Sequence, residues 1–190
     1  YGEGEQKAHA IMAETARSLG LGVMQDDACN SYFTLPGKNQ DAPAVLIGSH
    51  LDSVAQGGNF DGAAGVVSGL TALAALKDAG VVPTGPVTVM GIRAEESAWF
   101  GVSYLGSRAA LGMLPPGALQ AKRSDSGRSL AEHIAECGGD PEKLEGGQAL
   151  FDTSLIRAFL EPHIEQGPVL EERELPIGIV TGIRGNRRLP

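Results

Sequence analysis

The side chains of this sequence that can do metal or proton chemistry are imidazoles and carboxylates, and they lie shortly after strand-like segments. The candidates are His50, Asp52, Asp61, Glu95, Glu96 and His163. Nitrogen and oxygen donors of these types are what one or two catalytic divalent metal ions need, and a doubled acid leaves one carboxylate free to move protons. The pattern predicts a metal-dependent hydrolase.

His50 and Asp52 belong to the segment GSHLDSV at residues 48–54, at the end of an apolar run over 44–48. Such a run is typical of a parallel strand that is buried on both faces. Side chains two residues apart in extended backbone point to the same side. Asp52 can therefore accept the second N–H of a metal-bound His50 and fix its tautomer. A single histidine at a strand end is more often structural, so this motif needs the support of the next one.

Asp61 lies in the segment GGNFDG at residues 57–62, directly before a predicted helix over 62–79. Taken alone, an aspartate in this place is better explained as a helix N-cap. Together with His50 and the glycines between them, it favours a carboxylate that bridges two cations.

Glu95 and Glu96 follow a second apolar run over 86–92 with almost no polar spacer. The alternative is a solvated acidic helix start, which the helix dipole would favour. In the metal interpretation one carboxylate binds an ion, while the other takes a proton from metal-activated water and returns it to the leaving nitrogen.

His163 follows a strand-like run over 155–160 and is flanked by Glu165 and Gln166 before a Gly-Pro turn. This polar cluster at a strand end favours a ligand, and the Gln166 amide can hydrogen-bond a substrate amide. His9 and His133, by contrast, are predicted on solvated helix faces.

Strands and helices alternate along the chain, which predicts a layered α/β protein with its site at the carboxyl ends of the strands. Besides the segments named above, the pattern predicts helices over 5–19, 103–111 and 129–137, a hairpin of 22–26 with 31–35, and a strand over 177–183.

Length and composition narrow the class of protein. A chain of 190 residues can bury one respectable core, and its net charge of −8 gives no electrostatic reason to bind nucleic acid. The two cysteines are far apart and predict free thiols in a reducing, cytoplasmic compartment. No run has the length of a membrane span. Both ends read as cut, so a longer protein is expected.

Four motifs in this order resemble a known family: GSHLDSV at 48–54, GGNFDG at 57–62, AEE at 94–96 and PHIEQGPVLE at 162–171. They are similar to the hydantoinase/carbamoylase branch of the M20 metallopeptidase-like amidohydrolases. That branch includes N-carbamoyl-L-amino-acid hydrolases, allantoate amidohydrolases and β-ureidopropionases. The resemblance covers almost the whole chain.

The resemblance implies a zinc-peptidase-like layered α/β/α catalytic domain with a mixed, mostly parallel sheet. It implies two divalent ions (zinc, or manganese, cobalt or nickel) and hydrolysis of a linear C–N bond in a carbamoyl, ureido or N-acyl amino-acid-like small molecule. It also implies a role for each candidate: His50 and His163 on separate ions, Asp61 bridging them, Glu96 as a ligand, Glu95 as general base and acid, Asp52 orienting His50, and Gln166 facing the substrate. A cis peptide bond between Asp61 and Gly62 would accompany them.

Two departures from the family pattern bear on substrate and completeness. Residues 97–100 read SAWF, where many carbamoylases carry Gly-Ser/Ala-Arg-Phe, so Trp99 replaces an arginine near the site. The chain also ends before the family's inserted dimerisation domain and its last metal-binding histidine. We therefore expect residues 1–182 to be the first part of a catalytic domain and 183–190 the start of a hinge. The complete protein would be a homodimer, and this chain alone would bind metal weakly and turn over poorly.

Two other functions stay open. One is an aminopeptidase, dipeptidase or N-acyl-amino-acid deacylase of the same superfamily, which a panel of carbamoyl-amino acids, allantoate and dipeptides would separate. The other is a non-catalytic metal-binding or scaffold protein, which would be expected to have lost Asp61, Glu95 or Glu96, and all three are present.

Overall fold

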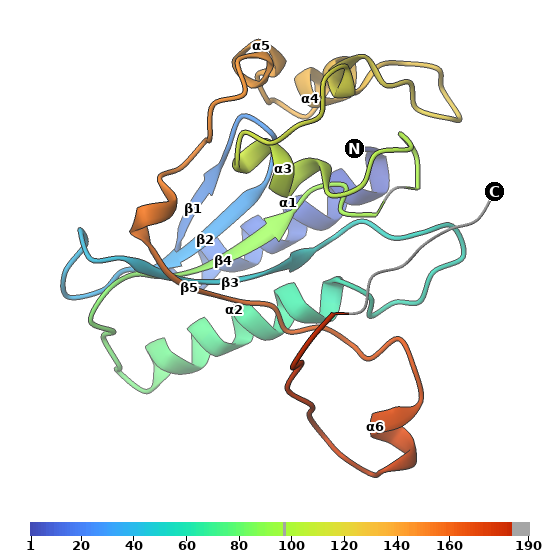
Figure 1. The fold of residues 1–190 in the computed structure, drawn as a ribbon. Coiled ribbons are helices and arrows are strands. Elements are labelled where there is room, and N and C mark those ends of the chain that lie inside the picture. Colours follow the sequence, from blue (N-terminus) through green and yellow to red (C-terminus); the bar gives the residue numbers. More distant parts are fainter. Residues whose placement is uncertain (97, 184–190) are drawn as a thin grey trace.

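The computed structural model describes residues 1–96 and 98–183 and contains one five-stranded sheet (Figure 1). The strands lie in the order β1-β2-β4-β3-β5. Their bounds are Gly22–Gln25 (β1), Ser31–Leu35 (β2), Ala44–His50 (β3), Val87–Ile92 (β4) and Ile156–Leu160 (β5).

The sheet is mixed, as predicted. β3 pairs in parallel with β4 on one side and β5 on the other, while β2 is antiparallel to both β1 and β4. Four strands therefore run in one direction and β2 runs against them. The predicted hairpin is formed by β1 and β2, where the Gly22 and Thr34 Cα atoms are partners. The mixed α/β fold class is confirmed.

One face of the sheet is covered by two 16-residue helices, α1 (Glu3–Ser18) and α2 (Ala63–Asp78). Phe33 of β2 and Val89 of β4 are fully buried against Val66 and Leu73 of α2, and Ala16 of α1 completes this core. Because β3-α2-β4 is a parallel crossover, α2 returns the chain to the edge from which β3 started. The carboxyl ends of β3 and β4 then lie next to each other.

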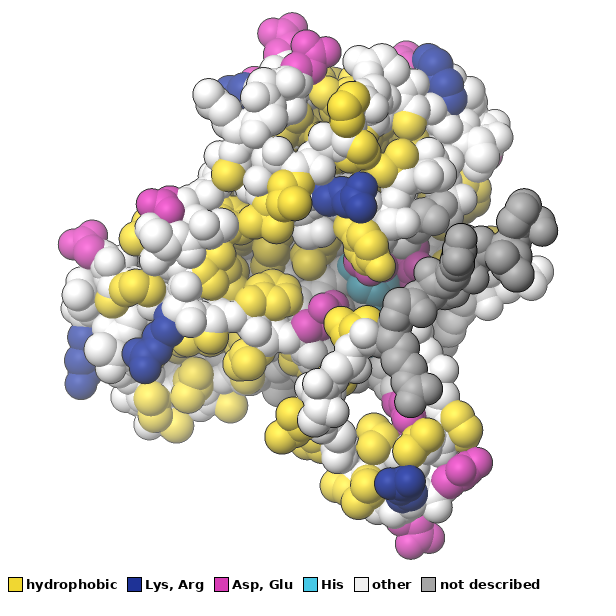
Figure 2. All heavy atoms as spheres, viewed as in Figure 1, with side chains coloured by type: hydrophobic (Ala, Val, Ile, Leu, Met, Phe, Trp, Pro, Cys, Tyr) yellow, Lys and Arg dark blue, Asp and Glu magenta, His cyan; other side chains and the backbone are white. Residues whose placement is uncertain are grey.

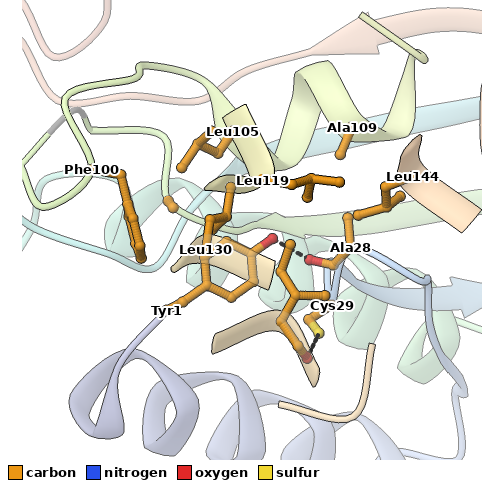
Figure 3. Close-up of a cluster of buried hydrophobic side chains, with 11 residues drawn as sticks. Tyr1, Ala28, Cys29, Phe100, Leu105, Ala109, Leu119, Leu130 and Leu144 are labelled. Carbon is orange, nitrogen blue, oxygen red and sulfur yellow. Dashed lines mark hydrogen bonds between the residues drawn. The ribbon is translucent and has the colours of Figure 1, made fainter. Parts of the chain in front are cut away.

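The other face is covered by α3 (Leu105–Ala110), whose Ala110 is buried against Tyr32, Met90 and Ile92 of the sheet. Beyond α3 lies a second apolar cluster, drawn in Figure 3, to which α4 (Leu130–Glu136) and α5 (Pro141–Glu145) contribute. The remaining short elements are two 3₁₀ turns, Ala118–Gln120 (η1) and Thr153–Leu155 (η2), and the helix Val169–Glu172 (α6).

The start of α4 shows how local sequence sets an element. The Ser129 hydroxyl accepts the backbone N–H of Glu132, and the Glu132 carboxylate accepts the backbone N–H of Ser129. This reciprocal pair is a capping box, which satisfies two backbone donors that a helix start otherwise leaves without partners. The prediction of a helix over 129–137 is confirmed.

Three sequence predictions about strands and burial are wrong. Residues 177–183 form no strand, and most of their apolar side chains are exposed. Their alternation favours β-structure, but no described strand pairs with them, and a strand needs such pairing. His9 and His133 are buried rather than solvated. His9 is a residue of α1 whose Nδ1 lies 2.8 Å from Ser31 Oγ of β2, and His133 packs edge-on against Phe100.

Two further expectations concern the chain's extent. Of the hinge predicted over 183–190, residues 184–190 lie outside the described residues. In the described part of the chain, no helix has both the length and the apolar character that crossing a membrane requires.

Candidate metal centre

Three neighbouring parallel strands bring the predicted residues to one edge of the sheet. His50 is the last residue of β3, Glu95 follows the end of β4 by three residues, and His163 follows the end of β5 by three. Because β4, β3 and β5 are adjacent and parallel, their carboxyl ends meet. In the space-filling view a histidine and acidic side chains meet in a hollow near the middle of the molecule (Figure 2).

His50 lies at the centre of the site, and its side chain is only 2% exposed. Its Nε2 lies 3.6 Å from Asp61 Oδ1 and 3.9 Å from Glu95 Oε2. Its Nδ1 lies 3.0 Å from the backbone oxygen of Asp52. That contact holds Nδ1 as the protonated nitrogen and leaves Nε2 as the free donor atom for an ion.

Asp61 lies between the two imidazoles. Its Oδ1 is 3.1 Å from His163 Nε2 and 3.6 Å from His50 Nε2, and it is buried without a hydrogen-bond partner among the described residues. Its Oδ2 accepts a 2.7 Å hydrogen bond from the side-chain amide of Gln166. A buried carboxylate oxygen flanked by two nitrogen donors fits a divalent cation, because such an oxygen otherwise stays without compensation.

Two overlapping groups of donors, both of which include His50, could hold a metal ion. His50, Asp61 and His163 form one, and His50, Glu95 and Glu96 form the other, with one ligand atom per residue and all atoms of a group within 4.8 Å of one another. All four predicted metal ligands and the predicted base therefore lie together. Their chemical type, nitrogen and oxygen without sulfur, suits a catalytic ion better than a structural one.

Glycines allow α2 to start this close to the site. Gly62 has φ 65°, a left-handed conformation, and a Cβ on it would lie 2.4 Å from His50 Nδ1. Gly65 lies against the segment after β5, where a Cβ would be 2.1 Å from the carbonyl oxygen of Pro162. The expected cis bond between Asp61 and Gly62 is not present, since the described peptide bonds are all trans. The positive φ of Gly62 turns the chain instead.

The charged groups of the site shift one another's pKa. Burial lowers the pKa of His50, but the Asp52 and Glu95 carboxylates favour its charged form more strongly, and the net effect raises its pKa to about 9. Burial raises the pKa of Glu95, which the charge on His50 opposes and the nearby carboxylates of Glu96, Asp52 and Glu161 reinforce. A raised carboxyl pKa is what a group that must both accept and release a proton needs.

Asp52 does more than the sequence indicated. Its Oδ1 accepts the backbone N–H of Glu95 at 2.9 Å, and its Oδ2 accepts that of Glu96 at 3.0 Å. Its carboxylate lies 3.4 Å from His50 Nδ1, farther than its own backbone oxygen. Asp52 therefore connects the β3 loop to the acidic pair.

Sequence reasoning missed one acid near the site. Glu161, the first residue after β5, accepts a 3.3 Å hydrogen bond from Ser49 and contributes to the raised pKa of Glu95. Its position directly after a strand, two residues before His163, was the available signal. Gln166, which the sequence predicts to contact the substrate, donates its side-chain amide to Asp61 in this structure.

Trp99, the departure from the family pattern, lies beside the site. It lines a cavity of about 300 Å³ together with Asp52, Glu96 and Arg123, and the Arg123 guanidinium carbon is 4.8 Å from the centre of its ring. This arrangement is a cation–π contact.

The fold and site define an α/β protein with a candidate centre for divalent metal ions, and comparisons with known proteins narrow the class. The Peptidase family M28 profile matches residues 30–121. An N-carbamoyl-L-amino acid amidohydrolase of Geobacillus stearothermophilus is 45% identical over 181 residues, which are 95% of this chain and 44% of that protein. Allantoate deiminase 1 of Glycine max is 34% identical over 186 residues, 96% of this chain and 38% of that protein.

A solved structure, a hydantoinase/carbamoylase family amidase from Burkholderia ambifaria, matches with a TM-score of 0.78 and 35% identity over 89% of this chain and 40% of that one. This chain is therefore a homologue of the hydantoinase/carbamoylase amidohydrolases, and the predicted resemblance is confirmed. The chain spans less than half the length of these relatives.

Proposed function

We propose that this chain carries most of the metal centre of an amidohydrolase that cleaves linear C–N bonds in carbamoyl, ureido or N-acyl amino-acid-like small molecules. The observation that carries the proposal is the buried Asp61 oxygen without a hydrogen-bond partner, which lies between the Nε2 atoms of His50 and His163. The carbamoylase and allantoate deiminase relatives support the substrate class.

In this proposal His50, Asp61, Glu96 and His163 would hold two divalent ions, zinc or alternatively manganese, cobalt or nickel, and Asp61 would be the shared ligand. Imidazole and carboxylate donors accept all of these ions, so availability decides among them. When bound, the ions supply Lewis acidity, which makes water a better nucleophile and polarises the carbonyl under attack.

Glu95 is the proposed general base and acid. Its Oε2 lies 3.9 Å from His50 Nε2, close to where an ion on that nitrogen would be, and its raised pKa allows it to hold a proton between two steps. It would take a proton from the attacking water and deliver it to the leaving nitrogen. Asp52 fixes the backbone of Glu95 and Glu96 and lies behind His50.

Gln166 is the proposed substrate contact. In the structure its amide donates to Asp61 Oδ2. A substrate carbonyl could displace Asp61 Oδ2 as the acceptor of this hydrogen bond. The Gln166 amide would then donate to the substrate instead.

A peptidase or deacylase of the same chemistry is the second candidate, and the Peptidase family M28 profile over residues 30–121 favours it. Hydrolysis rates with carbamoyl-amino acids, allantoate and dipeptides separate the two. Preference for dipeptides would assign the chain to the peptidases.

We also propose that a longer protein completes the site. Its relatives are more than twice as long as this chain, so residues 1–182 would form the first part of the catalytic domain and a further segment would supply the last metal ligand and a dimerisation surface. Full turnover by the purified 190-residue chain would contradict this. The homodimer and the cytoplasmic location stay predictions, which size-exclusion chromatography with light scattering and cell fractionation test.

The central experiment is the variant Glu95→Gln in the full-length gene product. It removes the proton carrier and keeps the shape, so we expect bound metal, measured by elemental analysis, to stay within twofold of wild type while hydrolysis falls by at least about 10²-fold. Glu172→Gln, on the exposed helix α6, is the matched control for loss of one negative charge. A proportionate loss of metal in Glu95→Gln would make Glu95 a ligand instead of the proton carrier.

A further inference from the structure

Residues 93–96, which connect β4 to the acidic pair, are held through their backbone by side chains from three other segments. All four backbone N–H groups donate to side-chain oxygens. The acceptors are Asn30 Oδ1 for residue 93 (2.9 Å), Glu5 Oε1 for residue 94 (2.8 Å), Asp52 Oδ1 for residue 95 (2.9 Å) and Asp52 Oδ2 for residue 96 (3.0 Å). Four consecutive amides satisfied in this way leave the segment little freedom to turn.

The carbonyl side of the same segment is also fixed. The carbonyl oxygens of residues 93, 94 and 95 accept the N–H groups of residues 106, 105 and 104 at 2.9, 3.1 and 2.8 Å. Ala94, in the middle, has φ 44°, a left-handed conformation that an alanine adopts only where its surroundings impose it. The hydrogen bonds on both sides supply that constraint.

The acceptors are themselves held in place. Asn30 is fully buried, and its Nδ2 donates to Asp26 Oδ2 at 2.8 Å and to the Gly106 carbonyl at 3.0 Å, so only its Oδ1 is left to accept. The Glu5 side chain is 6% exposed and lies 3.8 Å from the Arg93 guanidinium. Neither residue forms a hydrogen bond or an ion pair with His50, Asp61 or His163 among the described residues.

Asp52, which also contacts His50, supplies the remaining two acceptors for the amides of residues 93–96. Because the Asp52 backbone oxygen already holds His50 Nδ1 at 3.0 Å, both carboxylate oxygens are available to the amides of Glu95 and Glu96. We call Glu5, Asn30 and Asp52 the amide cradle.

We propose that the residues of the amide cradle are positioning residues, which act through the backbone of residues 93–96 to aim the carboxylates of Glu95 and Glu96 at the ion on His50. This inference rests on the proposed function. Its energetic reason is that a buried N–H left without an acceptor costs about 1–3 kcal/mol, so the segment rotates to find another partner when an acceptor is removed. The carboxylates at its end move with it.

The test compares Glu5→Ala with Glu5→Gln in the full-length gene product, because glutamine keeps an Oε1 acceptor for the Ala94 amide and alanine does not. The first readout is hydrogen–deuterium exchange of a peptide spanning residues 93–96 in the metal-free protein. The second is zinc affinity by competition with a chromophoric chelator. Leu73→Ala, a fully buried position in α2 outside the cradle, controls for general destabilisation.

We expect Glu5→Ala to raise exchange of this peptide at least tenfold and to weaken binding of one zinc ion by about 10–100-fold, as changes behind metal ligands do. Glu5→Gln should stay within threefold of wild type in both, and Leu73→Ala should leave zinc affinity unchanged. Wild-type exchange in Glu5→Ala, or raised exchange with unchanged zinc affinity, would overturn the proposal.

If Glu5→Ala does not fold, Asp52→Asn replaces it, since it keeps the backbone contact to His50 and turns one acceptor oxygen into a donor. Asp52→Asn is likewise expected to raise hydrogen–deuterium exchange of the 93–96 peptide and to weaken zinc binding. Wild-type protein that binds zinc but hydrolyses none of the substrates would overturn the proposed function, while exchange and affinity would still decide on the cradle. Wild-type protein that does not bind zinc would overturn both.

Discussion

Replacing Gly62 by alanine tests how closely α2 approaches the metal centre. Gly62 has φ 65°, where an L-residue loses about 1–2 kcal/mol relative to glycine. The added Cβ would also lie 2.4 Å from His50 Nδ1. Side-chain Cβ atoms essentially never come nearer than 3.0 Å to another heavy atom, so the imidazole or the start of α2 must move by at least 0.6 Å, the difference of the two distances.

His50 has little room to move, because it is 2% exposed and Asp52 lies behind it. Forcing extra volume into such a packed place costs about 1–3 kcal/mol. The cost of the positive φ adds to this packing cost. We therefore expect Gly62→Ala to lower the free energy of unfolding by roughly 2–5 kcal/mol. Where the protein still folds, the displaced imidazole should weaken zinc binding by about 10–100-fold.

Two other glycines serve as controls that separate the backbone cost from the cost of the steric clash. Gly80, at the end of α2, has φ 66° but open space around an added Cβ, so Gly80→Ala carries the backbone term alone, about 1–2 kcal/mol. Gly58 has neither a left-handed φ nor a neighbour within 4 Å, so Gly58→Ala should change stability by less than about 0.5 kcal/mol. Urea unfolding of the three variants and zinc titration give the comparison. If Gly62→Ala loses no more stability than Gly80→Ala, the close approach to His50 is refuted.

Three further predictions concern other parts of the fold. Burial, with the charge of Arg93 adding to it, lowers the pKa of His9 to about 2, so the unfolded chain binds a proton there that the folded chain does not. Below pH 6.5 His9 should therefore reduce the free energy of unfolding by about 1.4 kcal/mol per pH unit, and urea unfolding of His9→Asn should lack that share of the slope. Ser129→Ala removes the capping box of α4 and should lower unfolding free energy by about 1 kcal/mol in the same assay. Gly65→Ala places a Cβ 2.1 Å from the Pro162 carbonyl; elemental analysis should then show loss of the ion on His163, and unchanged metal content would count against the packing of α2 there.

Much of the site was predictable because its residues stand directly after strands. Apolar runs marked β3, β4 and β5, and adjacent parallel strands bring their carboxyl ends together whatever the loops do. His50, Glu95 and His163 could therefore be placed at one edge from the sequence. Small residues also let α2 pack closely, since Gly65 and Gly69 lie against the sheet.

The supporting contacts were not predictable in the same way. Glu5 and Asn30 lie 89 and 63 residues from the backbone amides whose hydrogen bonds they accept, and nothing in their own sequence neighbourhood marks them as partners of the segment after β4. His9 has a polar helical neighbourhood, so only the packing of α1 on β2 reveals its burial. The strand prediction for residues 177–183 is wrong for the opposite reason. Their local pattern is strand-like, but a strand forms only where a partner strand pairs with it.

The strands that carry the candidate metal ligands differ in how firmly they are held in the sheet. In the described sheet β3 and β4 are paired on both sides, whereas β5 lies at an edge and most of its residues are exposed. Segments at a sheet border open more often than the centre during the fluctuations of a native protein. If the proposed ions are bound, the ion on His163 should accordingly exchange with ions in solution faster than the ion on His50 and Glu96. On the proposed function, one metal would then be held firmly and the other would be exchangeable.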